Sequence, residues 1–141
     1  MIREATHEDI PDLVRMSRKF VEALGRKPNN ESIIETLEFL INDKSGIILM
    51  QDRHAMIGGL TSEVFFDRDD IGATELFWWV EEQFRGSGAG IALLNGLESW
   101  SRSIGASRLS MMAMESLGAD VAGIYKKHGY TKWETAYVKE L

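Results

Sequence analysis

An acidic residue at the edge of an aromatic run is the first feature that could do chemistry. Glu75 begins the apolar stretch Leu76 to Val80, which predicts a buried strand. Side chains alternate along a strand, so Glu75 is expected to share a face with Phe77 and Trp79. A carboxylate held against those rings would have the raised pKa that a general base near neutral pH needs. A solvated charge at the strand end is the equal alternative, and Glu115, after the next predicted strand, is the second candidate base.

A glycine-rich turn follows this strand and leads into a helix. It reads Arg85-Gly86-Ser87-Gly88-Ala89-Gly90, and Ile91 then opens a series of apolar residues at helical spacing. The first N–H groups of a helix lack internal partners, and the helix dipole also favours an anion there. Glycines permit left-handed backbone angles and the close approach of a phosphate. The order of strand, turn and helix therefore predicts a phosphate-binding turn, with an unliganded turn as the alternative.

Two familiar phosphate-binding patterns do not fit this turn. A P-loop ends in Gly-Lys-Ser/Thr, and no lysine stands in that position. A dinucleotide fingerprint needs a third glycine where this sequence has Ile91. Another class of phosphate-binding turn is therefore indicated.

Composition excludes several classes of function. The chain has 141 residues, of which 44% are apolar and 27% charged, and residues 1–141 are expected to form one globular domain. It contains no cysteine, which excludes a thiol nucleophile, and its histidines lack metal-ligand spacing, so no metal site is expected. A net charge of −6 disfavours nucleic acid and favours a cationic partner. Without an apolar membrane span or a signal peptide, we expect a cytoplasmic protein and no membrane partner.

Periodicity and turn residues predict an alternation of strands and helices along the whole chain. The predicted strands are 2–5, 47–50, 55–66, 75–80, 109–114 and 130–138, and the predicted helices are 10–24, 31–41, 88–104 and 120–128. Gly58-Gly59, inside the third strand, suggests a bulge. This order favours an α/β (α+β) fold, with a mixed sheet and helices on its faces.

Two segments of the sequence resemble signatures of the GNAT family of N-acetyltransferases. The turn at Arg85 to Gly90 is similar to that family's pattern Arg/Gln-x-x-Gly-x-Gly/Ala, and Tyr125 to Tyr130 is similar to its pattern Tyr-x-x-x-Gly-Phe/Tyr. The resemblance covers nearly the whole chain. It implies a mixed, mostly antiparallel sheet of roughly six to seven strands, flanked by about four helices and splayed at the central strand.

The resemblance also implies roles for particular residues. The pantetheine arm of acetyl-coenzyme A would lie along Trp78, Trp79 and Val80, with a backbone N–H at Val80 for the oxyanion. The pyrophosphate would be held by Arg85 and the N–H groups of Gly86, Ser87, Gly88, Ala89, Gly90 and Ile91. Tyr125 would be the general acid beside the coenzyme sulfur, or else an aromatic residue that packs its helix on the sheet. The family's usual asparagine and alanine are here Gly118 and Val121, and Ser116 or Asp120 could substitute for the asparagine.

These observations predict an acetyl-coenzyme A-dependent N-acetyltransferase acting on a primary amine of a small molecule or protein. Without cysteine, direct attack in a ternary complex is the simple mechanism. A non-catalytic module with the same fold, binding acyl-coenzyme A or another protein, is the alternative. Edge pairing of the last strand would offer a route to a homodimer.

Overall fold

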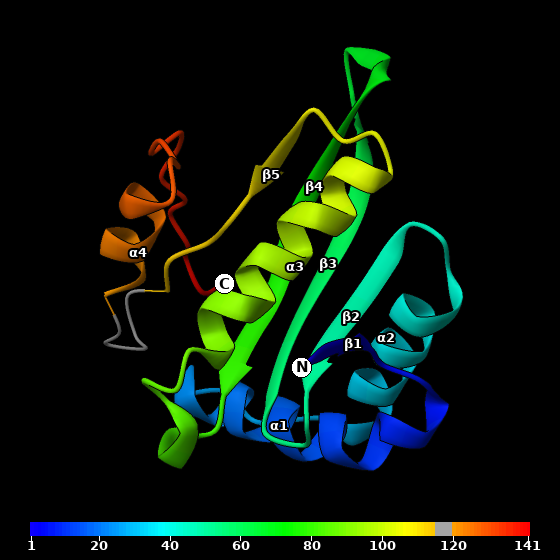
Figure 1. Cartoon of the computed structure of the whole chain (residues 1–141), viewed down its shortest axis with the longest axis vertical. Coiled ribbons are helices and arrows are strands. Elements are labelled where there is room, and N and C mark those ends of the chain that lie inside the picture. The colour runs from blue at the N-terminus through cyan, green and yellow to red at the C-terminus, as the bar shows by residue number, and fades with distance from the viewer. Residues whose placement is uncertain (115–119) are drawn as a thin grey trace.

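The sheet is mixed and mostly antiparallel, as predicted. A computed structural model describes residues 1–114 and 120–141. The strands of the sheet lie in sequence order, β1 (Ile2–Glu4), β2 (Gly46–Gln51), β3 (Ala55–Val64), β4 (Asp67–Val80) and β5 (Arg108–Ser110). The first four strands pair antiparallel with their neighbours, and β5 runs parallel to β4 (Figure 1).

Helices cover both faces of this sheet. They are α1 (Ile10–Ala23), α2 (Asn30–Asn42), α3 (Ala89–Ser103) and α4 (Val121–Lys127), with short 3₁₀ turns η1 (His7–Asp9) and η2 (Glu82–Phe84). α3 runs across the sheet in front of β3 and β4, whereas α1 and α2 lie against the other face (Figure 1). In the part of the chain that the structure describes, no helix has the length and apolar character needed to cross a membrane.

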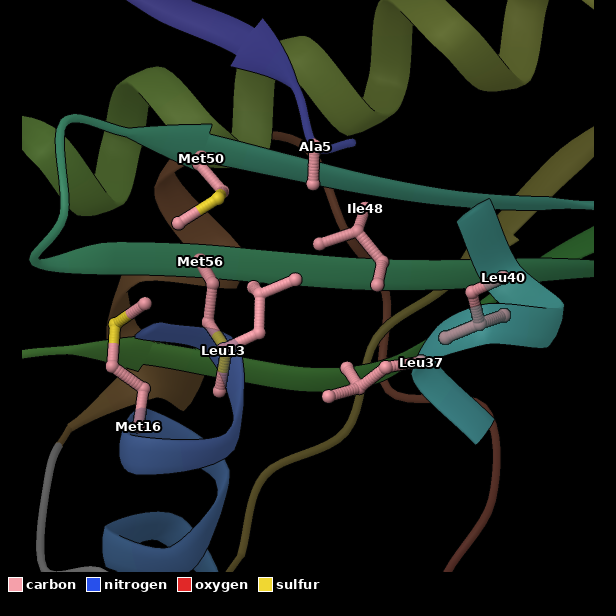
Figure 2. Packing of buried hydrophobic residues seen from close by; sticks show 8 residues of the cluster. All are labelled: Ala5, Leu13, Met16, Leu37, Leu40, Ile48, Met50 and Met56. Carbon is pink, nitrogen blue, oxygen red and sulfur yellow. The ribbon is translucent and has the colours of Figure 1, made fainter. Parts of the chain in front are cut away.

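Alternating side chains of β2 explain the two layers. Ile48 and Met50 pack with residues of α1 and α2, and Figure 2 shows this cluster, which consists of Ala5, Leu13, Met16, Leu37, Leu40, Ile48, Met50 and Met56. Ile47 and Leu49 point to the opposite face and pack against α3. A strand that is apolar on both faces is buried on both, which is why β2 reads as a continuous apolar run.

The sheet has fewer strands than expected, because the predicted last strand, 130–138, does not form. Residues 130–141 have no regular structure and contact the body through side chains, such as Arg108 over the Trp133 ring. Residues 109–114 were also expected to be a strand, but β5 ends at Ser110. β-branched and aromatic residues favour strands only where a partner strand pairs with them, and neither segment finds one here.

The central hairpin differs from its prediction in length and register. β4 begins at Asp67, so the polar segment 67–72, expected to be a connection, belongs to the strand. The predicted bulge at Gly58 and Gly59 is confirmed by a register shift between them. Gly58 lies opposite Phe77 and Gly59 opposite Glu75, so the extra residue is Leu76 in β4.

Candidate active site

β4 and β5 pair over a short distance and then separate. Their register ends at Thr74 and Ser110, although β4 continues to Val80 (Figure 1). Beyond this point β4 still pairs with β3 on one side, but on its other side the described residues supply no strand partner for residues 75–80. The splay implied by the family resemblance is therefore present, and we use that word for the opening between residues 75–80 and 111–114.

The bulge at Leu76 decides the direction of the Glu75 side chain. Residues opposite each other in an antiparallel pair project to the same face. A Cβ built on Gly59 would lie 2.7 Å from Leu97 of α3, so Glu75, opposite Gly59, projects to the α3 face. A Cβ on Gly58 would lie 2.4 Å from the Phe77 ring, which puts Phe77 on the other face. The prediction that Glu75 shares a face with Phe77 and Trp79 is therefore wrong, because the bulge inserts one residue between them.

Glu75 nevertheless has the electrostatic character that the sequence suggested. Its side chain is buried, and its Oε1 accepts a hydrogen bond from the backbone N–H of Met112 at 3.3 Å. Burial raises the pKa of Glu75 to about 7, and the Met112 N–H opposes this shift. A carboxyl group with this pKa exchanges a proton readily near neutral pH.

Tyr125 of α4 meets Glu75 at the same backbone position. Its Oη donates a hydrogen bond of 2.6 Å to the carbonyl of Met112, and its ring stacks on Trp78 with centroids 6.2 Å apart. Burial, followed by the charge of Glu75, raises the pKa of Tyr125 above its usual range. The phenol therefore keeps its proton, and the structure brings the two predicted catalytic residues together around Met112.

Backbone groups of β4 also face the splay. Opposite residues of an antiparallel pair alternate between those that exchange hydrogen bonds and those that do not. The N–H of Glu81 donates a 2.8 Å hydrogen bond to the carbonyl of His54 in the β2–β3 turn. By alternation, the backbone groups of Trp79 also point toward β3. Those of Trp78 and Val80 therefore point away from β3 and toward the splay. The Val80 carbonyl accepts a 2.9 Å hydrogen bond from Arg85 Nε, which fits this alternation.

The two predicted indoles lie on opposite faces of β4. Trp78 packs with the α3 layer and Trp79 with the α1 layer, where Phe20 meets it edge to face at 6.3 Å. The Arg85 guanidinium lies 4.8 Å from the centre of the Trp79 ring. Arg85 is thus held beside the end of β4 by one hydrogen bond and one ring contact.

The glycine turn has an open, left-handed backbone. Gly86 and Gly88 have φ angles of +84° and +92°, and a Cβ on either would meet nothing within 4 Å. α3 starts at Ala89, whose N–H has a 3.4 Å contact with Ser87 Oγ, and no acidic residue lies in its first turn. The predicted helix start is confirmed within one residue, and the first N–H groups of a helix are those that lack partners within it.

Glu81 directly follows β4, where a turn carboxylate is usually solvated, but here it is buried. Its carboxylate pairs with Lys19 Nζ at 2.9 Å and Arg15 Nε at 3.4 Å, both from α1. Burial alone would raise the pKa of Glu81, but the hydrogen bonds and charge of its partners, with Lys19 first among them, together outweigh burial and lower that pKa. Two features of the sequence could have indicated this burial. Glu81 is two residues past Trp79, so it continues the face of β4 that packs on α1, and Arg15 and Lys19 lie one helical turn apart in α1.

Other predicted positions have a simpler outcome. Asp120 caps α4, since its side chain accepts from the Gly123 N–H at 3.0 Å. Glu115, Ser116 and Gly118 lie outside the described residues, so the alternative base and the missing asparagine have no structural account.

The family model of the acetyltransferase (GNAT) family matches residues 12–130. The chain therefore belongs to this family, and the predicted resemblance is confirmed. No protein with a curated description matches the sequence.

Solved structures share the fold at low sequence identity. A transcriptional regulator from Bacillus halodurans superposes with a TM-score of 0.82 and 15% identity, covering 100% of this chain and 99% of that one. A ribosomal-protein-alanine N-acetyltransferase from Brucella melitensis superposes with a TM-score of 0.78 and 16% identity, covering 100% of this chain and 98% of that one. An aminoglycoside antibiotic 6′-N-acetyltransferase from Acinetobacter haemolyticus superposes with a TM-score of 0.75 and 15% identity, covering 100% of this chain and 99% of that one. At such identities the likeness shows the fold alone.

Proposed function

We propose that this protein is an acetyl-coenzyme A-dependent N-acetyltransferase that acetylates a primary amine by direct attack. The observation that supports this most strongly is the meeting of Glu75 and Tyr125 at Met112, on the α3 side of the splay. One group has a pKa of about 7 and the other keeps its proton, so an acid and a base are available within one site.

The residues of the turn and the splay fit the coenzyme. Arg85 and the N–H groups from Gly86 to Ile91 would hold the pyrophosphate, because φ is left-handed at two glycines and their missing Cβ atoms leave open space. Trp78 would offer its backbone groups to the pantetheine amides, as an edge strand does to an added strand, and Val80 would meet the coenzyme at the thioester through its N–H. Trp79 would contribute from the other face, by keeping Arg85 at the end of β4.

Each catalytic group of the site would accept a proton, donate a proton or stabilise a developing charge. Acetyl-coenzyme A supplies the acetyl group as a thioester. Glu75 would take a proton from the acceptor ammonium, directly or through water, so that the neutral amine can attack the thioester, and Tyr125 would give a proton to the departing sulfur. The Val80 N–H would donate to the carbonyl oxygen as negative charge develops there. With no cysteine in the chain, the acetyl group would pass to the amine without a thiol intermediate.

The acceptor is proposed to be a cationic amine. A net charge of −6 favours positively charged partners. Two proteins of the same fold carry names for amine acetylation, one of an aminoglycoside antibiotic and one of a ribosomal-protein alanine. Both a small molecule and a protein amine therefore stay open for this chain, which we expect to act in the cytoplasm, with a homodimer as its proposed assembly.

A panel of amines tests the proposal. Purified protein is incubated with acetyl-coenzyme A and an aminoglycoside, a polyamine, a lysine peptide and peptides with free N-termini, and products are followed by mass spectrometry. We expect one class to gain a single acetyl group at a rate that depends on enzyme concentration. Coenzyme binding without acetylation of any amine would instead support a non-catalytic acyl-coenzyme A-binding module.

A further inference from the structure

A pocket separate from the splay lies on the α1 side of the molecule, at the end of β4. It has a volume of about 370 Å³ and is lined by Arg15, Lys19, Arg53, His54, Glu81, Gln83 and Phe84. We call it the α1 pocket. Glu75 and Tyr125 do not line it, so it is separate from the proposed catalytic centre.

The charges of the α1 pocket are arranged in two layers. Glu81 lines the pocket with a side chain 6% exposed, and Asp12, which pairs with the lining residues Arg15 and Arg53, has a side chain 14% exposed. The side chains of Lys19 and Arg53 are 52% and 81% exposed. Arg53 binds Asp12, Lys19 binds Glu81, and Arg15 binds both carboxylates. Three cations thus pair with two carboxylates, of which Glu81 is buried and Asp12 half-buried, and this leaves one excess positive charge at the rim of the pocket.

Among the residues that the structure describes, two donors at this rim have bonds to spare. Arg53 directs Nε and Nη2 to Asp12, at 2.9 and 3.3 Å, and a guanidinium has a further Nη group. Lys19 gives one hydrogen bond of 2.9 Å to Glu81, and an ammonium has three donors. Arg15, by contrast, bonds to Asp12, Glu81 and the Arg53 carbonyl. Lys19 and Arg53 are therefore the residues available to an anion.

An aromatic pair forms another wall of the pocket. The rings of His54 and Phe84 stack with centroids 3.7 Å apart and an interplanar angle of 17°. Phe84 belongs to η2, which directly precedes Arg85 and the glycine turn. The α1 pocket and the proposed pyrophosphate site are thus joined by one short segment of chain.

We propose that the α1 pocket binds a phosphate dianion, either a phosphomonoester or inorganic phosphate, through Lys19 and Arg53. A phosphate has three terminal oxygens to receive donors from two separated cations, and an arginine fork matches them well. The phosphate could be the 3′-phosphate of coenzyme A, which would rest on the proposed function, or it could be free phosphate binding independently. Both sources present phosphate oxygens to Lys19 and Arg53. In the first case the phosphate binds only as part of the coenzyme, and in the second it binds without the coenzyme.

A coenzyme comparison tests the first source. Calorimetry compares acetyl-coenzyme A with acetyl-dephospho-coenzyme A, which lacks the 3′-phosphate. We expect the wild type to prefer the phosphorylated form by about tenfold, the usual scale of one or two charge-assisted hydrogen bonds. Arg53→Gln and Lys19→Gln should each reduce that preference. Arg68→Gln, which removes a cation 89% exposed on the β3–β4 hairpin, is the matched control and should retain it.

Inorganic phosphate tests the second source without the coenzyme. The His54 ring is followed by NMR as phosphate replaces chloride at constant ionic strength, and a saturable shift that Arg53→Gln abolishes would support the pocket. If neither form of the coenzyme binds but phosphate moves His54, the proposed function fails and the α1 pocket stands. Coenzyme binding with no preference and no phosphate response at His54 would overturn the pocket and leave the proposed function intact.

Discussion

Glu75 is a residue whose chemistry follows from burial. Its pKa of about 7 results from desolvation of the charged form, so the carboxylate becomes populated as pH rises through neutrality. A base must be ionised to accept a proton, and we therefore expect kcat/KM to rise with pH and level off above about 7. The pH profile of the wild-type enzyme with its amine acceptor measures this directly.

Glu75→Gln tests whether that rise belongs to Glu75. The amide retains an oxygen for the Met112 N–H but cannot take a proton, so kcat should fall about a hundredfold or more and the rise with pH should disappear. Glu82→Gln, an exposed neighbour near the turn, is the matched control and should behave like the wild type. A Glu75→Gln enzyme with full activity and an unchanged profile would remove Glu75 from the mechanism.

Tyr125 combines a packing role with a proposed proton role, and Tyr125→Phe separates them. The ring stack on Trp78 is kept, whereas the hydroxyl and its bond to the Met112 carbonyl are lost. We expect kcat to fall about tenfold to a hundredfold, with the Kd for acetyl-coenzyme A nearly unchanged. Tyr137→Phe, at an exposed tyrosine, is the control. Equal turnover in both variants would mean that Tyr125 only packs α4 against the sheet.

At the scale of the element, the bulge in β4 positions the site. Leu76 is the inserted residue that turns Glu75 toward α3, and the Phe77 ring lies directly over Gly58. In Gly58→Ala the new Cβ would lie 2.4 Å from Phe77 Cζ, so the ring must move. We expect a loss of about 1–3 kcal/mol in the free energy of unfolding, measured by urea denaturation.

Gly72→Ala is the matched control for the bulge. Gly72 lies in β4, the strand that carries the bulge, and its Cβ would come no closer than 3.6 Å to Arg108, an ordinary contact. Its stability should equal or exceed that of the wild type, since alanine loses less backbone entropy on folding than glycine. If Gly58→Ala and Gly72→Ala unfold alike, the close packing of Phe77 on Gly58 does not support the bulge.

Across the whole molecule, the features that depend on residues close in sequence were predicted well, and those that depend on contacts between distant segments were not. The turn and the starts of α3 and α4 depend on neighbouring residues, and both helices begin within one residue of the predicted position. The face of Glu75 depends on one inserted residue, and the burial of Glu81 depends on cations from a distant helix. Residues 130–138 have strand propensity, but a strand also needs a partner, which composition cannot supply.

The central claim is that the glycine turn holds the phosphates of acetyl-coenzyme A, and calorimetric titration of the purified protein tests it most directly. Wild-type protein should bind the coenzyme. Gly88→Ala should bind at least about tenfold more weakly, because alanine is strained by roughly 1–2 kcal/mol at a φ of +92° and its Cβ enters the open space of the turn.

Gly90→Ala is the matched variant for this titration. Gly90 lies within α3, and its Cβ would make ordinary contacts, the nearest 3.5 Å from the Trp78 ring. It should bind acetyl-coenzyme A within about twofold of the wild type and be slightly more stable, because alanine favours helix over glycine. Wild-type binding that is lost only in Gly88→Ala would support the account. No binding to the wild type, or equal binding by both variants, would contradict it.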